Sequence, residues 1–361
     1  MAPAQLSLAT VNLANLQLPG EPMYEGDKPY TREQYDAKVA WTAQGVQALD
    51  ADIIGFQELW HPDALTDVFK QAGLHDSYHL AAAPAAAGRI ANAVAVRLPH
   101  ELLDADWIVK FPERFVLRSG REPAVNTGAD ESAAGTDYTM NVAIREFSRP
   151  VVHARVKTHQ GRRRPTVDVL VAHLKSKRAT ILEPKDRDAL RSADEKALGS
   201  ALSTIRRAAE AAALRLILND LMNDQTPTAV VGDLNDGPAA VTNTIITAEP
   251  RHRLFAASQT GRSSRHGLYA AANLQEYRSL RDVYCTYIHE GAHESLDHIF
   301  VSQHFYDYAD LRLWSFRQLR ALNDHLDDFR TGFTPASDHA PTAATFDFNP
   351  VKASTPTGPQ D

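Results

Sequence analysis

The pentapeptide Gly232-Asp233-Leu234-Asn235-Asp236 directly follows the apolar run Ala229-Val230-Val231. A short β-branched run that ends in Gly, Asp and Asn predicts a buried strand with polar side chains at its carboxyl end. In α/β proteins this edge of a sheet is where ligands bind. Because the same residues are common turn formers, the stretch alone is equally consistent with an ordinary turn.

The pattern recurs, which changes its meaning. Five further strand-like segments carry polar or ionisable residues at an end, and these are Asn12, Gln57-Glu58, His173, Leu296-Asp297-His298 and Ser337-Asp338-His339. The set combines oxygen donors of the kind that Mg²⁺ or Mn²⁺ prefers with imidazole, carboxylate and amide groups that can transfer or orient protons. Each motif alone is typical of a turn or a solvated charge, whereas the complementary set predicts a catalytic site.

These motifs, in this order, resemble the endonuclease/exonuclease/phosphatase superfamily, and within it the relatives of deoxyribonuclease I and exonuclease III. The resemblance covers residues 5–348. It implies an α/β fold in the form of a four-layer sandwich, in which two packed, mostly antiparallel mixed sheets are flanked by helices. It also implies a divalent-metal-dependent phosphodiester hydrolase that uses in-line attack of an activated water on phosphorus.

The resemblance also assigns roles to individual residues. Metal ligands are expected at Asn12, Glu58 and Asp338, with Mg²⁺ as the expected ion and Mn²⁺ or Ca²⁺ as alternatives. Asp233 is expected to orient or deprotonate the nucleophile, and Asn235 to hold the phosphate.

In the same scheme Asp297 polarises His339. Whether His339 acts as a base or as a charged phosphate clamp stays open. The alternation of a strand points Asp297 and His298 to opposite faces, so only one of them can enter a shared site, and we expect it to be Asp297.

His173 separates branches of the superfamily. The abasic-site endonuclease branch carries a tyrosine at the matching strand end, so histidine disfavours abasic-site repair and favours a general acid for the leaving alkoxide. The run His173-Leu174-Lys175-Ser176-Lys177 is similar to bacterial nuclease-type members. We expect substrate binding by Lys175, Lys177 and Arg178, and by Asn92 unless that amide is structural.

Composition limits the function further. The chain has 361 residues, 43% of them hydrophobic, a formal charge of −7 and one cysteine, Cys285. The negative charge disfavours nonspecific coating of nucleic acid. No apolar run approaches the roughly 18 residues of a membrane span. No signal peptide is visible, so we expect a cytoplasmic protein, or a secreted one if a leader was removed.

Along the chain we expect one catalytic domain over residues 1–348 and a disordered tail over 349–361. Helices are predicted at 31–50, 62–72 and 185–222, and long loops at 112–138 and 257–276. Arg162-Arg163-Arg164 is interpreted as a solvated hairpin tip.

His289-Glu290-Gly291-Ala292-His293 matches the zinc-protease pattern H-E-x-x-H, which requires a helix. Because strand formers flank it and Gly291 disfavours a helix, it is interpreted as a hairpin turn.

Three functions remain open. The leading hypothesis is a nuclease-type phosphodiesterase acting on nucleic acid or another phosphodiester. The net acidity, and the lack of an obvious strip of aromatic and basic residues, keep open a phosphodiesterase or phosphatase for a small or lipid substrate. A catalytically silent binding protein is the third, although none of the matched positions is lost. No protein partner can be inferred.

Overall fold

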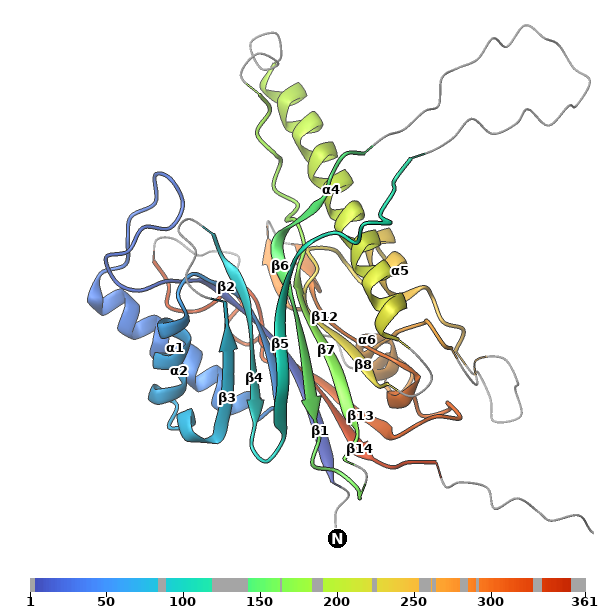
Figure 1. Ribbon diagram of the computed structural model, residues 1–361. Helices are drawn as coiled ribbons and strands as arrows, with labels where there is room; N and C mark the ends of the chain where they lie inside the picture. The colour runs from blue at the N-terminus through green and yellow to red at the C-terminus, as the bar shows by residue number, and fades with distance from the viewer. Residues whose placement is uncertain are drawn as a thin grey trace, which may run out of the picture.

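The two six-stranded β-sheets of the protein pack face to face, and helices cover the outer face of each. The computed structural model describes residues 4–83, 89–118, 142–162, 164–183, 191–222, 226–252, 261, 264–279, 285–289, 292–326 and 333–351. Figure 1 shows α1 and α2 beside one sheet and α4 and α5 beside the other. The predicted four-layer α/β sandwich with mixed sheets is confirmed.

The first sheet has the order β13-β14-β1-β2-β4-β3. Its strands are β1 (Gln5–Leu16), β2 (Ile53–Leu59), β3 (Tyr78–Ala82), β4 (Ala91–Arg97), β13 (Trp314–Ala321) and β14 (Thr342–Phe348). β1 is parallel to β2 and antiparallel to β14. This sheet therefore joins the two ends of the chain.

The second sheet has the order β5-β6-β7-β8-β12-β9. Its strands are β5 (Glu101–Lys110), β6 (Glu146–Lys157), β7 (Thr166–His173), β8 (Thr228–Asp233), β9 (Tyr269–Ala270) and β12 (Asp297–Val301). β7 and β8 are parallel, whereas β12 runs antiparallel to β8. The fully buried strands β7 and β8 are rich in valine, as expected for strands covered on both faces.

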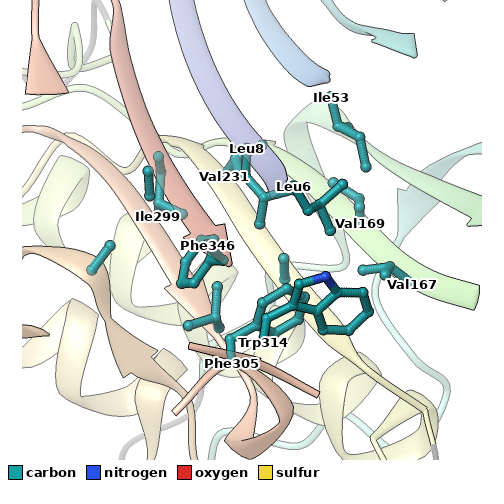
Figure 2. Close-up of a cluster of buried hydrophobic side chains, with 14 of the residues drawn as sticks. Leu6, Leu8, Ile53, Val167, Val169, Val231, Ile299, Phe305, Trp314 and Phe346 are labelled. Atoms are coloured by element: carbon teal, nitrogen blue, oxygen red, sulfur yellow. The ribbon is translucent and has the colours of Figure 1, made fainter. Parts of the chain in front are cut away.

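The main core lies between the sheets. Leu6, Leu8 and Ile53 from the first sheet pack with Val169 and Val231 from the second (Figure 2). Gly55 on β2 lies at a close approach of the two sheets, because a Cβ atom there would be 2.6 Å from Val231 and 2.8 Å from Val171. A glycine is thus required at this point of the interface.

The helices bury the outer faces. α1 (Arg32–Leu49) and α2 (Pro62–Gln71) cover the first sheet, and Thr31 and Gln34 form a capping box at the start of α1. α4 (Ser192–Leu221) and the short α5 (Val241–Thr247) cover the second sheet. In the described part of the chain, no helix is both long and apolar enough to cross a membrane.

Several local predictions can be checked directly. The helices expected at 31–50 and 62–72 are confirmed, and the described part of 185–222 is helical from Ser192. The loop expected at 257–276 is wrong at its end, because β9 and α6 (Ala271–Glu276) lie there. Of the loop expected at 112–138, residues 112–118 are irregular and the rest lies outside the described residues.

The H-E-x-x-H segment is not helical where it is described. Its ends lie on β10 (Tyr287–His289) and β11 (Ala292–Glu294), which pair antiparallel. The hairpin interpretation is therefore confirmed. Arg164, near the β6–β7 hairpin tip, pairs with Glu101 at 2.6 Å, whereas Arg163 lies outside the described residues. Of the tail expected to be disordered, only residues 349–351 are described, and residues 352–361 lie outside.

Candidate active site

The polar strand ends meet at one edge of the sandwich. β7 ends in His173 and β8 in Asp233, and these two residues are paired in register. Asp297, the first residue of β12, is the partner of Asp233 on the other side. Asn12 on β1 reaches across from the first sheet and donates from Nδ2 to Asp233 Oδ2 at 3.0 Å. The site is thus built by both sheets together.

Gly232 makes the close approach of β7 and β8 possible. Its φ is +153°, and a Cβ atom there would be 1.8 Å from the carbonyl oxygen of Ala172. No other residue fits without moving one strand. The glycine of the pentapeptide therefore holds Asp233 next to His173.

Asp233 lies at the centre of the site. Its Oδ1 accepts a hydrogen bond from the backbone N–H of Asn235 at 2.8 Å, and its Oδ2 lies 3.5 Å from Nε2 of His173 and 3.7 Å from Nε2 of His339. Burial, together with the nearby Asp297, raises the pKa of Asp233 well above the usual carboxyl range, even though His339 opposes the shift. Such a group can accept a proton near neutral pH.

His339 and Asp297 form a buried pair. Nδ1 of His339 lies 2.8 Å from Oδ2 of Asp297, and the hydroxyl of Ser337 accepts from the His339 backbone N–H. Burial alone would disfavour the charged ring, but Asp297 and then Asp233 raise the pKa of His339 well above its ordinary value. The ring is therefore held in its charged form, with Nε2 facing Asp233.

The neighbouring His298 points away, as strand alternation predicts. Its Nε2 lies 2.8 Å from the backbone oxygen of Asp236, and it also contacts the side chain of Asn243. The side chain of Asp236 is in turn held by Arg207 and Thr242. These groups stabilise the loop after β8.

His173 differs from His339 in its charge state. Its ring is 2% exposed, Nε2 faces Asp233 and Glu58, and Nδ1 is buried without a hydrogen-bond partner among the described residues. Burial, reinforced by Arg149 and His339, lowers the pKa of His173 well below its ordinary value. The neutral ring this favours can donate a hydrogen bond, and leaving-group protonation stays a prediction.

Two of the three expected metal ligands line a cleft next to these residues. Glu58 and Asp338 both line it, and burial, together with the charge of Asp338, raises the pKa of Glu58. A cation between two such carboxylates would relieve this cost. The amide nitrogen of Asn12 donates a hydrogen bond to Asp233, while its Oδ1 accepts one from the backbone N–H of Ala14 at 2.9 Å. Asn12 therefore orients Asp233, and coordination by Asn12 stays a prediction.

A second group could also hold a metal ion. Asp233, Asp297 and His339 each offer one ligand atom, and these atoms lie within 4.8 Å of one another. Oδ1 of Asp297 is buried without a hydrogen-bond partner in the described chain, as a position for an ion or a water would be. A proton on His339 would compete with a metal there. Glu58 and Asp338 supply carboxylate oxygens alone, so a metal bound by them does not require the deprotonation of an imidazole.

The backbone of the site is unusual at strand ends. Glu58 has φ +60° and Asn235 has φ +55°, a conformation that residues other than glycine seldom adopt. Asn235 is further held by its Nδ2, which donates to the backbone oxygen of Leu174 at 3.0 Å. Such conformations are typical of functional sites, where surrounding contacts outweigh the strain.

The expected substrate-binding residues occupy different positions. Arg178 lines the cleft, whereas Lys177 pairs with Glu294 and the Lys175 ammonium is held by backbone oxygens and Ser176. Asn92 is fully buried, and its amide nitrogen donates to the backbone of Pro150 and Val171, as in the structural alternative. Their roles in binding stay predictions.

Sequence reasoning missed several cleft residues. Arg149 donates to the backbone oxygen of Leu174 at 3.1 Å and lines the cleft, and Tyr24, Tyr30 and Phe333 line it as well. The cleft has a volume of about 650 Å³. Tyr24, Tyr30 and Phe333 come from loops without strand or helix patterning, and Arg149 lies on β6 outside all of the recognised motifs, so no local signal identified them.

Glu210 on α4 holds two backbone segments of this region. The carboxylate is fully buried, and it accepts from the backbone N–H of Ser148 at 2.8 Å and of Lys175 at 2.7 Å. These residues are next to Arg149 and two positions after His173. Glu210 therefore fixes the relative placement of both.

The family profile described as "Endonuclease/Exonuclease/phosphatase family" matches residues 37–339, which include all the motifs except Asn12. The chain belongs to the endonuclease/exonuclease/phosphatase family. As a family member it is a phosphoesterase, with a buried Asp/Asp/His group that could hold a metal ion. A search of curated proteins found no match.

Solved structures share the fold over nearly the whole chain. A family protein from Bacteroides thetaiotaomicron is 15% identical with a TM-score of 0.52, covering 96% of this chain and 99% of that one. The mannosyl-6-phosphatase of the same organism gives 15% and 0.52, covering 95% and 100%. The human Nocturnin catalytic domain gives 16% and 0.52, covering 96% and 95%. At these identities the likeness shows the fold alone.

Proposed function

We propose that this protein is a divalent-metal-dependent phosphodiester hydrolase of the nuclease type, which cleaves its substrate by attack of a water molecule on phosphorus. One observation carries the proposal. Asp233 is buried, its pKa is raised, and its Oδ2 lies within 3.7 Å of Nε2 of both His339, which favours the charged form, and His173, which favours the neutral form. Asn12 and Asn235 orient its carboxylate by hydrogen bonds. A proton acceptor, a cation and a neutral donor thus lie together next to Glu58, which lines the cleft.

The residues divide the chemistry among them. Asp233 accepts the proton of the attacking water on Oδ2, the oxygen that faces both imidazoles. His339, kept charged by Asp297, stabilises negative charge that develops on the phosphoryl group. His173 places Nε2 3.5 Å from Oδ2 of Asp233, where the neutral ring can donate a hydrogen bond to the leaving oxygen of the substrate. A divalent ion held by Glu58 and Asp338 would neutralise phosphoryl charge and lower the pKa of a bound water.

A diester substrate is favoured by the limited supply of cations in the cleft. A phosphomonoester is close to a dianion at neutral pH, whereas a diester carries one charge. Among the described lining residues, Arg149, Arg178 and Lys38 carry positive charge, and Lys38 lies over the ring of Tyr30. Arg149 and Arg178 line the same cleft as Glu58 and Asp338, the expected metal ligands. The bacterial nuclease-like run after His173 supports nucleic acid as the substrate.

The proposal is tested by a substrate panel. The protein is incubated with Mg²⁺ or Mn²⁺ and with plasmid, single-stranded DNA, RNA, a bis-aryl phosphate and a sugar monophosphate. We expect cleavage of nucleic acid, abolished by EDTA and strongly reduced in Asp233→Asn. Cleavage of the aryl diester alone would refute the nuclease function, and hydrolysis of the sugar phosphate alone would favour a phosphatase. No turnover of any substrate would favour the binding-protein alternative.

A further inference from the structure

The cleft beside the catalytic residues has two chemically different walls. Its lining includes aromatic side chains, of which Tyr24, Tyr30 and Phe333 are here called the aromatic wall, and basic side chains, of which Arg149 and Arg178 are called the basic wall. The walls come from segments far apart in the sequence. The strip of aromatic and basic residues that the sequence lacks is therefore assembled by folding.

The aromatic wall presents open ring surface to the cleft. Tyr24 is 46% exposed and Phe333 is 43% exposed, although both belong to residue types that normally pack. Each ring is supported on one side by edge-to-face contact, Tyr24 by Trp60 at 5.0 Å between centroids and Phe333 by Tyr30 at 6.0 Å. Supported rings with free surface can stack on a planar ligand.

The aromatic wall is also tied to the expected metal position. Asn15, with φ +62°, donates its backbone N–H to Oε2 of Glu58 at 3.0 Å. Its backbone oxygen accepts from the Tyr30 hydroxyl and its Oδ1 from Nε1 of Trp60, both at 3.1 Å. One residue therefore fixes the spacing between the aromatic wall and a catalytic carboxylate, so the cleft is organised before a ligand arrives.

The basic wall reaches the aromatic wall at one point. Burial and the charge of Glu58 raise the pKa of Tyr24, and the nearby guanidinium of Arg149 opposes this shift. The tyrosine therefore stays neutral at physiological pH and keeps a polar edge next to a guanidinium. A ligand with a phosphate beside an aromatic ring matches this order of groups.

We propose that Tyr24 and Phe333 form a stacking subsite for a nucleobase next to the scissile phosphate, while Arg149 and Arg178 bind the phosphate itself. The inference rests on the proposed nuclease function and specifies how the substrate is selected. Stacking on aromatic rings tolerates any base, so the subsite would select a nucleotide without selecting its sequence. Exposure alone does not identify a stacking subsite: Tyr308 is 50% exposed as well, but it lines a different pocket, away from the catalytic residues.

The test separates base recognition from phosphate recognition. Binding is measured by calorimetry in Mg²⁺ for two probes, thymidine 5′-monophosphate and 1,2-dideoxyribose 5-phosphate, which differ only by the base. For the wild type we expect the nucleotide to bind about tenfold more tightly, within the range for a base on an aromatic ring. Tyr24→Ala and Phe333→Ala should each reduce this preference, and the double variant should abolish it.

The controls keep the outcome specific. The Kd of the sugar phosphate should stay within about twofold in both variants, Phe333→Tyr should retain the base preference, and Tyr308→Ala should change neither Kd. A wild type without base preference, a preference that survives the double variant, or no binding of either probe would overturn the subsite. Base preference without cleavage of any nucleic acid in the substrate panel would instead retain the subsite and refute the proposed nuclease activity.

Discussion

Replacing Asp297 by Asn removes the charge that holds His339 in its protonated form. The two side chains are 2.8 Å apart, and only 8% of the His339 side chain and 1% of the Asp297 side chain are exposed. A hydrogen bond to a charged group contributes about 1.5–3 kcal/mol. Because 1.36 kcal/mol corresponds to tenfold in rate, Asp297→Asn should lower kcat between about 10- and 150-fold.

A double-variant cycle is the assay. We expect the combination of Asp297→Asn with His339→Ala to be scarcely slower than His339→Ala alone, because Asp297 acts through the imidazole. The Mg²⁺ concentration for half-maximal turnover should stay unchanged in Asp297→Asn. Asp307→Asn, which removes a carboxylate paired with Arg278 elsewhere in the fold, is the matched control and should retain full activity.

Two results would refute this reasoning. If the two single losses multiply in the double variant, Asp297 acts independently of His339. If Asp297→Asn instead requires much more Mg²⁺, the carboxylate is a metal ligand, and its unpartnered Oδ1 is the atom that binds. Thermal unfolding of each variant distinguishes both results from a loss of folded protein.

Four further predictions concern other residues. Glu58→Gln should raise the Mg²⁺ concentration needed for turnover because an anionic oxygen is lost; full turnover of the wild type in EDTA would exclude a metal site. If His173 protonates the leaving group, His173→Ala should slow alkyl esters far more than activated aryl esters, whereas equal losses would indicate phosphate binding. Glu210→Ala leaves two backbone N–H groups without an acceptor, which should lower the free energy of unfolding in urea by about 2–6 kcal/mol; a loss below about 1 kcal/mol would show that water replaces the carboxylate. Burial would raise the pKa of Asp52, but its interactions with His100, 3.8 Å away, and with the Ser7 hydroxyl and backbone N–H lower it overall, so the stability that Asp52→Asn removes should be complete above about pH 5 and shrink as pH falls below about 4; a difference that is independent of pH would contradict this assignment.

The strand ends of the site were predictable because their chemistry is local. A valine run followed by Gly232 and Asp233, or by His173, shows both the burial of the strand and the polar group at its end. Alternation along β12 also sufficed to separate Asp297 from His298. Two adjacent residues on a strand have only two faces to occupy, so the pattern determines the geometry.

Other features depend on contacts that no local pattern contains. Arg149 enters the site because Glu210, 61 positions later, binds the backbone next to it. The helix α6 has only six residues and no side-chain cap, so the sequence contains no signal that marks it, and the segment 257–276 is predicted to be a loop. An amide such as that of Asn12 can either coordinate a cation or donate a hydrogen bond, and only the position of Asp233 decides which group it faces.

Because Gly55 has no side chain, the two sheets pack closely at this point, and the activity of the protein depends on that close packing. The site residues divide between the two halves of the sandwich, with Asn12, Glu58 and His339 in one half and His173, Asp233 and Asp297 in the other. The contacts between these two sets therefore cross the interface between the sheets, whose close packing depends on Gly55. Separation of the halves by the width of one methyl group would break 2.8 and 3.0 Å hydrogen bonds while leaving each sheet's own ladder intact. Heat, pressure or an enlarged core residue should therefore inactivate the enzyme before circular dichroism detects any loss of secondary structure. Turnover therefore reports the distance between the two sheets, which the secondary-structure signal in circular dichroism does not.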